Sequence, residues 1–506
     1  MALYDVVVVG GGGTGLMAAL AAAKQGATVL VLEKGPQLGG TTAMSVGTVA
    51  ASGTRLQRES GIDDHPDAHF DDMALFKPEQ ANRDHLSLRR LLVDHAPETI
   101  ALLEDCGVVF MGPLPEPPHR VPRLHAIIPH SRGFIDHLAR VCTTHGVTFK
   151  TQMQVVKMRE EAGRVSGVLA EDRQGMAHEI GARRAVILAS GDFSAAGLDY
   201  KSRFMSGALL EIGGINPLST GDGQAMGEEM GGEVLNGDMA WGPELRFLAP
   251  ATPSLIARLP TWTVLAKLLL KAIHLCPAWI MRPFLMGFVT TFLAPSPNLF
   301  QKGAILINQQ GHRFCDERQR PQDHVGRQTP DTGFIVFGSE IARLFQAWPN
   351  FISTAPGVGY AYLNDYEGAR KDIVHRQQTL QALAQSIGVP FNALQQAVDQ
   401  HNQQAALDET LQPIQQGPFY ALGPVKSWIV FSEGGLKIDP HFRVLDRQGQ
   451  PIKGLYAAGS AGQGGLLLEG HGHHLAWAFT SGRLAGEQAA KETPLGERTT
   501  DQAIAS

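Results

Sequence analysis

The chain has 506 residues, a formal net charge of -6 and 43% hydrophobic residues. This length allows more than one domain around a well-buried core, and the charge balance gives no indication of nucleic-acid binding. Its four cysteines, Cys106, Cys142, Cys276 and Cys315, are far apart and form no CxxC pair. They exclude an obvious haem attachment site, an iron–sulfur cluster within this chain and a disulfide framework. A reducing, cytoplasmic compartment is therefore expected, and a strand predicted close to Met1 leaves no room for a signal peptide.

Residues 5–34 read as a strand, a glycine-rich turn, a helix and a second strand, with the sequence DVVVVGGGGTGLMAALAAAKQGATVLVLEK. The β-branched run at 5–9 predicts a buried parallel strand. A helical pattern then extends to Gln25, and residues 28–32 predict the next strand. A strand, turn and helix in this order form the first unit of a dinucleotide-binding sheet.

The glycines of this unit have GxGxxG spacing, and each has a mechanical role. Gly10 allows a tight turn, Gly12 lets the backbone approach a pyrophosphate, and Gly15 lets helix and strand pack closely. Glu33 ends the second strand, where an acid would bind a ribose hydroxyl. Because the spacing stands inside a complete structural unit, it predicts a dinucleotide cofactor.

Further motifs follow in order along the chain: KGPQLGGTTAMSVGTVAASGT at 34–54, VILASGDFS at 186–194, STGDGQAMGEEMG at 219–231 and GGLKIDPHFRVLDRQGQPIKGLYAAGSAGQGG at 434–465. With the N-terminal unit they resemble the FAD-dependent oxidoreductase 2 family. That family includes fumarate reductases, succinate dehydrogenase flavoprotein subunits and 3-ketosteroid dehydrogenases. In the family the first of these segments passes beneath the flavin and the last closes the FAD site, so the resemblance implies FAD as the cofactor.

The motifs and the resemblance define a set of expected FAD-binding residues. Asp222 opens a helical stretch and is placed to receive hydrogen bonds from the flavin or ribityl group, although a simple helix cap is the alternative. A second helix begins near His474, and its N-terminus should face the flavin pyrimidine. The expected residues are Gly10, Gly12, Gly13, Thr14, Gly15, Glu33, Lys34, Gly40, Thr41, Thr42, Ser45, Gly47, Val155, Ala189, Ser190, Gly191, Asp222, Gly459, Gly465 and His474.

Two absences refine the cofactor prediction. Relatives with covalent FAD carry a histidine in the segment that matches 39–48, which here reads GGTTAMSVGT, so the resemblance implies non-covalent FAD. The sequence has no second strand–GxGxxG–helix unit, so a separate NAD(P)H domain is not expected. Electrons must then reach or leave the flavin through a partner, a quinone, a diffusible carrier or oxygen.

The motif positions predict an α/β protein with a Rossmann-like, three-layer FAD-binding domain and an inserted α+β cap domain. Residues 1–236 and 415–506 should build the FAD domain, and 237–414 the cap that carries the substrate site. Alternating apolar and polar residues at 146–190 predict a β-meander that returns to the main sheet. The polar tail after Glu492 is expected to fray.

The sequence departs from the fumarate reductases where these bind a dicarboxylate with two histidines and two arginines. The first histidine falls on Ala240–Glu244, and the second on Val430 or Phe431. Arg318 and Arg320 lie near the position of the acid-donating arginine but out of register, and the other arginine corresponds to Glu469. A buried carboxylate without cationic partners is strongly disfavoured. Fumarate or succinate is therefore not the expected substrate.

The comparison with 3-ketosteroid dehydrogenases is closer in character. Counted back from SGR at 481–483, the tyrosine of their "TYPGPG" loop falls on Leu468, and the glycine whose N–H holds the substrate carbonyl falls on Gly472. The hydroxyl is thus absent while the backbone donor remains. Tyr360, Tyr362 and Tyr366 in the cap are available as replacements.

The loop LLLEGHGHHLAW places Glu469, His471, His473 and His474 together at the predicted flavin edge. Histidine titrates near neutral pH, and a buried glutamate does so after an upward shift, so these side chains are candidates for proton transfer. Histidines that only contact the flavin are the alternative. A metal site fits less well because the spacing matches no recognised zinc motif, and no metal is predicted.

The cap segment 260–295 is unusually apolar. Lys267, Lys271 and His274 fall at i, i+4 and i+7 on a helix predicted over 263–275 and ended by Pro277. The segment falls short of the roughly 20 apolar residues that span a membrane. Peripheral contact with the inner face of a membrane, a channel wall for an apolar substrate and an ordinary packed cap helix all stay open.

These features predict an FAD-dependent oxidoreductase that exchanges hydride with a carbon–carbon bond next to a carbonyl. The expected substrate is an apolar ketone, ketosteroid-like or terpenoid. Gly472 is the expected donor to the carbonyl oxygen, and Glu469, His471, His473, Tyr360 and Arg318 complete the candidate catalytic set. One alternative is a fumarate-reductase-like enzyme for a small carboxylic acid that uses Arg318 or Arg320. The other is a flavin-binding electron-transfer subunit without its own substrate.

Overall fold

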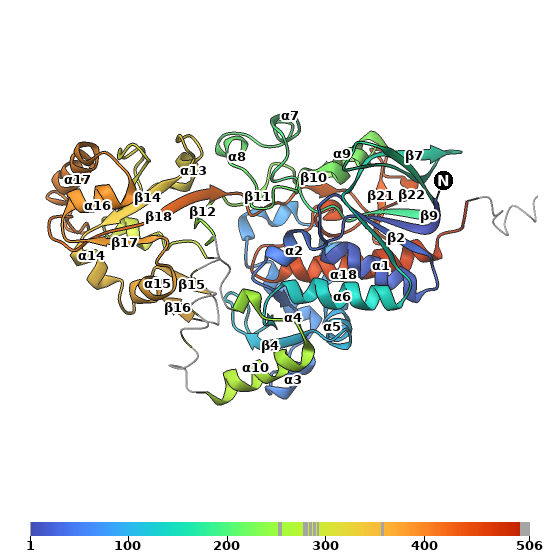
Figure 1. Cartoon of the computed structure of the whole chain (residues 1–506). Helices are drawn as coiled ribbons and strands as arrows, with labels where there is room; N and C mark the ends of the chain where they lie inside the picture. Colours follow the sequence, from blue (N-terminus) through green and yellow to red (C-terminus); the bar gives the residue numbers. More distant parts are fainter. Residues whose placement is uncertain are drawn as a thin grey trace, which may run out of the picture.

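The N-terminal unit lies at the centre of the main sheet (Figure 1). β1 (Ala2–Val9) leads into α1 (Gly13–Lys24) and then into β2 (Val29–Glu33), which pairs with β1 in parallel. Residues 6–9 are buried, as expected for a β-branched strand covered on both faces. The computed structural model describes residues 2–250, 256–276, 293–355 and 359–495, together with 282, 286 and 290.

The main sheet joins segments from both ends of the chain. Its strands run in the order β21 (Arg443–Leu445), β22 (Pro451–Ala457), β9 (Ala177–Leu188), β1, β2 and β6 (Thr148–Thr151). β22, β9, β1, β2 and β6 pair in parallel, and β21 is antiparallel at the edge. The Rossmann-like α/β fold expected from the sequence is confirmed.

The predicted meander over 146–190 is also present. β7 (Met153–Glu161) pairs with β8 (Arg164–Asp172), and β8 pairs with β9, each antiparallel. β9 then enters the main sheet beside β1. The alternation of apolar and polar residues in this segment reflects strands with one buried and one exposed face.

Helices cover the main sheet, and two of them pack closely (Figure 1). α18 (His473–Lys491) lies along α1. A Cβ on Gly482 would lie 2.4 Å from the carbonyl oxygen of Thr14, so only glycine permits this approach. The other helices of this body are α2 (Gly40–Met44), α3 (Arg55–Glu59), α4 (Pro66–Met73), α5 (Leu86–Asp105), α6 (Arg132–Thr144), α7 (Leu198–Lys201), α8 (Ala208–Glu211) and α9 (Asp222–Glu229).

Small sheets connect these helices to the rest of the chain. β3 (Thr48–Ala50), β5 (Leu124–Ile128) and β4 (Val109–Leu114) form a three-stranded sheet. β10 (Val234–Leu235) pairs with β20 (Gly435–Leu436), and β11 (Ala240–Trp241) pairs with β19 (Phe431–Ser432). The last two pairs bring the segment before the cap against the segment after it.

A second body has its own antiparallel sheet and core (Figure 1). The sheet contains β12 (Glu244–Phe247), β18 (Phe419–Trp428), β14 (Gly333–Phe337), β13 (Ile305–Ile307) and β17 (Val374–Gln377), and β15 (Ser353–Ala355) pairs separately with β16 (Gly359–Ala361). Its helices are α12 (Asn298–Gln301), α13 (Gln322–Val325), α14 (Ser339–Leu344), α15 (Leu363–Ala369), α16 (Leu380–Ile387) and α17 (Phe391–Ala405). Since β18 belongs to this sheet, we place the return to the FAD domain after Trp428, whereas the sequence suggested residue 415.

The predicted helix at 263–275 is present as α10 (Thr263–Leu275), while Pro277 and residues 496–506 of the tail lie outside the described residues. In the part of the chain that the structure describes, no helix has both the length and the hydropathy needed to cross a membrane.

Candidate active site

A cavity of about 620 Å³ opens at the carboxyl ends of the central strands. Val9, Leu32 and Ala189, at the ends of β1, β2 and β9, line one side. Residues 293–297 and Thr354 of the second body line another. Ligands of parallel α/β sheets bind at this edge because the strand ends and helix N-termini converge there.

Most of the FAD-binding residues expected from the sequence meet at this cavity. They come from seven separate segments between residues 9 and 475 of the chain. Lining it are Gly10, Gly12, Gly13, Thr14, Glu33, Lys34, Gly40, Thr41, Thr42, Ser45, Gly47, Val155, Ala189, Ser190, Gly191, Asp222 and His474.

Two positions at the junction of β1 and α1, Gly10 and Gly15, have no room for a side chain. Gly10 has a φ of +111°, and a Cβ there would lie 2.4 Å from the carbonyl oxygen of Ala189. A Cβ on Gly15 would lie 1.9 Å from the carbonyl oxygen of Gly10. Gly12 caps α1. The Gly13 amide donates to Thr42 Oγ1, and no acceptor within the described chain is found for the amides of Thr14 and Gly15. Such a helix N-terminus attracts an anion such as a pyrophosphate.

Glu33 is buried at the end of β2, and its carboxylate fixes the surrounding backbone. One oxygen accepts a hydrogen bond from the Gly11 amide at 2.8 Å, and the other accepts from the Gly35 amide at 2.6 Å. Each carboxylate oxygen can accept more than one hydrogen bond, so a ribose hydroxyl can still be bound there.

Asp222 is the first residue of α9 rather than its cap. Its carboxylate accepts hydrogen bonds from Lys34 Nζ at 3.0 Å and from Thr220 Oγ1 at 2.6 Å. No capping hydrogen bond from a side chain is found at α9, which begins at this residue. The pair of Lys34 and Asp222 thus ties the loop after β2 to α9 at the cavity wall.

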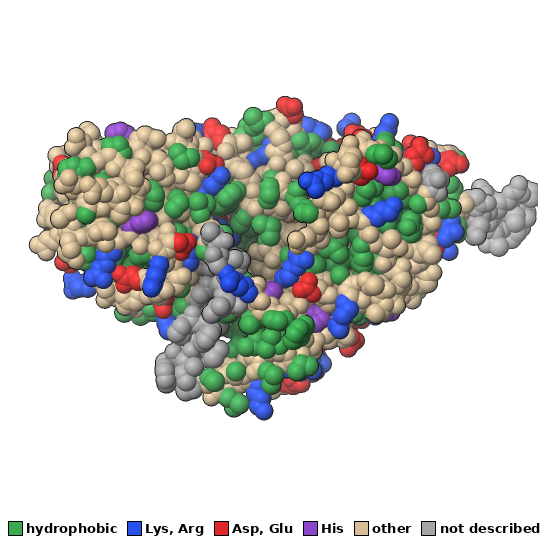
Figure 2. Space-filling view, viewed as in Figure 1, with side chains coloured by type: hydrophobic (Ala, Val, Ile, Leu, Met, Phe, Trp, Pro, Cys, Tyr) green, Lys and Arg blue, Asp and Glu red, His purple; other side chains and the backbone are tan. Residues whose placement is uncertain are grey.

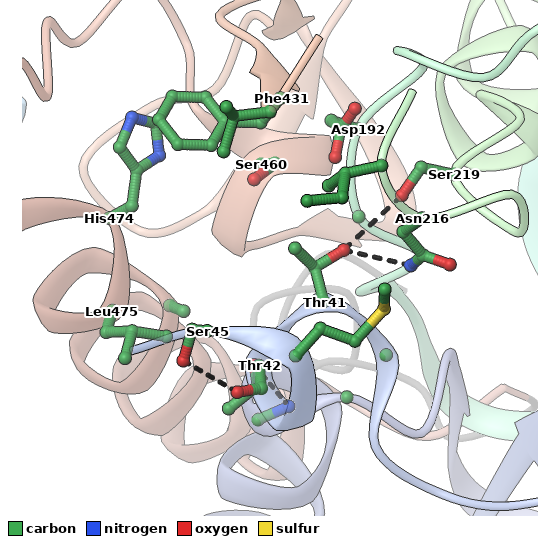
Figure 3. A pocket seen from close by; sticks show the side chains of 18 of the residues that line it. Thr41, Thr42, Ser45, Asp192, Asn216, Ser219, Phe431, Ser460, His474 and Leu475 are labelled. Carbon is green, nitrogen blue, oxygen red and sulfur yellow. Dashed lines mark hydrogen bonds between the residues drawn. The ribbon is translucent and has the colours of Figure 1, made fainter. Parts of the chain in front are cut away.

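Hydroxyl side chains form a network beneath the cavity (Figure 3). Asn216 Nδ2 donates to Thr41 Oγ1 at 2.9 Å, and Thr41 Oγ1 lies 3.4 Å from Ser219 Oγ. Thr42 Oγ1 accepts from the Gly13 amide at 3.2 Å, while Ser45 Oγ donates to the Thr42 carbonyl at 2.7 Å. The segment that follows β2 is thereby held against the start of α1.

The residues present fit FAD. Ser190 lines the cavity, and its Oγ is buried and has no hydrogen-bond partner within the described chain. An orphaned buried hydroxyl is costly unless a ligand completes it. Beside it, burial raises the pKa of Asp192, whose Oδ1 accepts from the Ser194 amide at 2.7 Å. The glycine turn, the open helix amides and the Ser190 hydroxyl together offer the donors that a dinucleotide binds.

The N-terminus of α18 faces the other end of the cavity, where Gly472, His474 and Leu475 line it. Gly472 adopts a φ of +85°, and a Cβ there would lie 2.7 Å from the Ala50 amide nitrogen. Among the described residues, no group accepts a hydrogen bond from the Gly472 amide. The expected backbone donor is therefore available at this end.

His471 lines the cavity and is held by a carboxylate that the sequence did not reveal. Its Nδ1 and its backbone amide both hydrogen-bond to Glu116, the amide at 3.0 and 3.1 Å from the two oxygens. Burial opposes protonation of the imidazole, but the hydrogen bond and charge of Glu116 outweigh it, so the pKa of His471 is raised. Nε2 is the ring nitrogen left for a substrate.

Arg246, on β12 of the second body, places a guanidinium group at the cavity wall. Arg246 binds Glu244 Oε2 through Nε at 3.0 Å and Nη2 at 2.8 Å, and Trp241 Nε1 donates to Glu244 Oε1 at 2.7 Å. All three side chains line the cavity beside Phe431. The charge of Arg246 is thus neutralised by a neighbour rather than free to bind a substrate carboxylate.

His473 points away from the cavity, into a buried cluster with His69 and His119. Its Nδ1 donates to the Glu469 carbonyl at 2.5 Å, so its Nε2 accepts from His69 Nε2 at 3.2 Å. Arg123 can only donate, so His119 Nδ1 accepts its hydrogen bond at 2.9 Å and the His119 proton sits on Nε2.

With these tautomers the three histidines do not direct three lone pairs at one point, as a metal ion would require. The positive charge of Arg123 beside them also opposes the binding of a cation. The histidines are neutral because burial lowers the pKa of His473 to about 4 and that of His119 to about 2. The pKa of His69 also lies well below its usual value for the same reason. The cluster instead holds the Glu469 carbonyl, and with it the loop that carries His471.

The remaining sequence candidates do not line the cavity. Glu469 pairs with Lys77 Nζ at 3.0 Å, and Arg318 pairs with Asp408 at 3.0 Å on the surface of the second body. The Tyr360 ring packs on Phe351, with 4.8 Å between centroids, and Phe351 rather than Tyr360 reaches the cavity.

Three of the expected FAD-binding glycines act in packing instead. Gly15 contacts the β1 turn, and the Gly459 amide donates to Ser481 Oγ at 2.8 Å. The Gly465 carbonyl accepts from the His85 amide at 3.1 Å.

Sequence reasoning missed Glu116, which holds His471, and several residues that line the cavity. Glu116 lies in a proline-rich stretch without a motif. Trp241, Glu244 and Arg246 lie in a segment that was considered only for the histidine it lacks. Asp192 stands inside VILASGDFS, next to residues that were chosen, and was the one with a local signal in the sequence.

Comparison with known proteins agrees with this geometry. A family model described as the FAD binding domain matches residues 5–252 and 286–467. The NADH:fumarate oxidoreductase of Klebsiella pneumoniae (strain 342) is 27% identical over 510 residues, which cover 96% of this chain and 48% of that protein. The chain therefore spans about half the length of this relative.

Two further similarities cover more of the other protein. The 4-oxocyclohexanecarboxylate 2-dehydrogenase of Sinomonas cyclohexanicum is 25% identical over 593 residues, covering 96% of this chain and 93% of that protein. The open conformation of a flavocytochrome c3 fumarate reductase aligns with a TM-score of 0.70 and 23% identity, covering 97% of this chain and 78% of that one. This last similarity shows a shared fold.

Proposed function

Because the chain belongs to the FAD binding domain family, FAD is its cofactor, and we propose that it is an oxidoreductase for a carbon–carbon bond next to the carbonyl of an apolar ketone. The observation that carries this proposal is the placement of His471, with its partner Glu116, beside the open amide of Gly472 at one end of the FAD cavity. Bound FAD supplies the two-electron redox chemistry.

The two groups of this loop have complementary roles at the ketone. The Gly472 amide donates to the carbonyl oxygen, where negative charge develops when the α proton is lost. His471 moves that proton: it accepts the proton in dehydrogenation and donates it in reduction. Its contact with Glu116 keeps Nδ1 occupied, so Nε2 is the atom that exchanges the proton.

The wall of the cavity supports an apolar substrate. Leu293, Ala294, Pro295, Phe351 and Phe431 line it, and Arg246 is neutralised by Glu244. A carboxylate brought here would face Glu244 as well as Arg246, which removes most of the electrostatic gain. We place the enzyme in the cytoplasm, in keeping with four free cysteines.

A second candidate function is the reduction of a small unsaturated carboxylic acid. The observation that favours it is Arg246, a guanidinium at the cavity wall. Arg318 and Arg320 do not serve this role because each pairs with a surface carboxylate, Asp408 and Asp323 respectively. A rearrangement of Glu244 would be needed to free Arg246.

Anaerobic absorbance of the flavin separates the two functions. We expect saturated cyclic ketones to bleach the oxidised holoenzyme stoichiometrically, or cyclic enones to restore colour to the chemically reduced holoenzyme. Fumarate and other enoates should do neither. A response to enoates alone would establish the second function, and a response to no compound of either class would contradict both.

A further inference from the structure

α10 lies in a stretch that the FAD binding domain model leaves unmatched, between residues 252 and 286. It is anchored to the first body at its N-terminal end. Thr263 Oγ1 donates to the Gly107 carbonyl at 2.8 Å, and Thr261 Oγ1 donates to Asp136 at 2.8 Å. Ala266 is fully buried beneath the helix. One side of α10 is therefore fixed to the protein.

The opposite side presents apolar side chains to solvent. Val264 and Leu275 are each 72% exposed and Leu268 is 60% exposed, at spacings that place them on one stripe of the helix. Trp262, which caps the helix, is 70% exposed. Figure 2 shows hydrophobic side chains gathered at the lower edge of the molecule, where Figure 1 places α10.

This concentration is unusual for a surface that faces only water. Four of the sixteen exposed large apolar side chains of the described chain fall within residues 262–275. Single exposed apolar residues are normal on soluble proteins, whereas a cluster on one helix face marks a contact with another apolar phase or surface.

Basic residues flank the apolar stripe. Lys267, Lys271 and His274 are exposed at i, i+4 and i+7. Their surroundings in the sequence contain no acid: residues 245–315 include no Asp or Glu but seven Lys and Arg. The whole chain has a net charge of -6, so positive charge is segregated into the stretch that carries α10.

We propose that Trp262, Val264, Leu268 and Leu275, with Lys267 and Lys271, form a docking face for the surface of an anionic lipid bilayer. Apolar side chains of such a helix enter the boundary between headgroups and acyl chains, and a tryptophan is favoured at that depth. Lysines extend along the apolar surface and place their ammonium groups among anionic headgroups. The acid-free sequence is complementary in charge to such a surface.

The stretch of chain that carries α10 also contributes residues to the wall of the cavity. Leu293, Ala294 and Pro295 lie in the acid-free stretch and line the cavity. An apolar ketone dissolved in the bilayer would then be delivered close to its site. This consequence rests on the proposed function, whereas lipid binding itself does not.

Vesicle co-sedimentation of the purified holoenzyme tests the docking face. The native protein should sediment with vesicles of phosphatidylcholine and phosphatidylglycerol, and much less with phosphatidylcholine alone or at high salt. The double variants Val264→Ser/Leu268→Ser and Lys267→Glu/Lys271→Glu should each weaken binding about tenfold or more. Flavin content and melting temperature should stay unchanged, because all four side chains are exposed.

Matched controls change equally exposed residues elsewhere. Leu198→Ser, at 64% exposure on α7, and Lys453→Glu, on the main-sheet body, should sediment like the native protein. Failure of the native protein to bind anionic vesicles would overturn the proposal, as would unchanged binding by the α10 variants. A concentration-dependent increase in mass that the α10 variants abolish, without lipid binding, would assign the face to a second copy instead. None of these readouts depends on a substrate, so they are independent of the proposed activity.

Discussion

His471 Nδ1 hydrogen-bonds to Glu116, a carboxylate 355 positions earlier in the sequence. The same carboxylate accepts the backbone amide of His471, so one side chain fixes both the imidazole and the loop that carries it. Glu116 is buried, and no cation competes with His471 for it among the hydrogen bonds and ion pairs of the described residues. The pair makes the proton-transfer role of His471 testable by pH.

Replacement of Glu116 by glutamine should lower the pKa of His471, because burial still opposes the charged form while the negative charge that outweighed it is lost. A group with a raised pKa stays protonated to higher pH, so the native reductive activity should fall only as pH rises through that value. In Glu116→Gln the alkaline limb of kcat/KM should move to lower pH. The exposed Glu79→Gln serves as the control, and a limb that does not move would contradict the role of His471.

Replacement of Glu244 by glutamine should free the charge of Arg246 at the cavity wall. We expect the Kd of a small enoate, measured by titration of the holoenzyme, to fall about tenfold, which corresponds to about 1.4 kcal/mol of binding. Binding of an uncharged ketone should change little. Glu340→Gln, in a surface ion pair with Arg343, is the matched control. Equal effects on charged and uncharged substrates would show that Glu244 acts through structure alone.

Substitutions at Gly12 and at Gly15 should have different consequences. A Cβ on Gly12 would lie no closer than 3.8 Å to a neighbouring atom, so Gly12→Val should fold but lose FAD, because its side chain enters the space for the pyrophosphate. A Cβ on Gly15 would meet the Gly10 carbonyl at 1.9 Å, so Gly15→Ala should lower the melting temperature of the apoprotein as well. Flavin absorbance and thermal melting together distinguish the two outcomes.

Acid or heat precipitation should release the flavin into the supernatant, since residues 39–48 contain no histidine for a covalent bond. The measurement is the absorbance of the supernatant against that of the washed pellet. Colour that stays with the denatured chain would contradict the non-covalent assignment.

The buried histidine cluster should make the protein sensitive to acid. Burial lowers the pKa of His473 to about 4 and that of His119 to about 2. Below about pH 6.5 these imidazoles therefore bind protons in the unfolded chain but not in the folded chain. The contribution of the neutral histidines to the free energy of unfolding is therefore fully present above that pH. It is lost as pH falls toward 4, by about 1.4 kcal/mol per pH unit for each histidine.

Denaturant unfolding between pH 7 and pH 4.5 measures this slope. His119→Gln should reduce the slope of unfolding free energy against pH by the contribution of one histidine. The variant should also be less stable than the native protein at pH 7. His312→Gln, at an exposed position, should leave the slope unchanged. A native slope near zero over this range would show that the cluster is protonated in the folded state.

The sequence by itself determined the elements whose signals are local. The β1–α1–β2 unit, the helix that begins at Asp222, the start of α18 and the bounds of α10 all follow from hydrophobic periodicity and glycine spacing within a few contiguous residues. The FAD site was predictable for the same reason, since its glycines and hydroxyls lie in short motifs at the ends of these elements. The Gly472 amide was expected only from the resemblance to 3-ketosteroid dehydrogenases, and within the described chain it has no acceptor.

Tertiary structure decided which side chains act together. Within HGHH, the left-handed turn at Gly472 and the first turn of α18 send His471 and His474 to the cavity but His473 into a buried cluster with His69 and His119. No spacing in the sequence encodes that division, because it depends on where α4 and the loop of His119 pack against α18. The partners Glu116 and Glu244 likewise lie in segments that carry no recognisable motif. Which charged groups pair with them depends on how these segments pack in the folded chain.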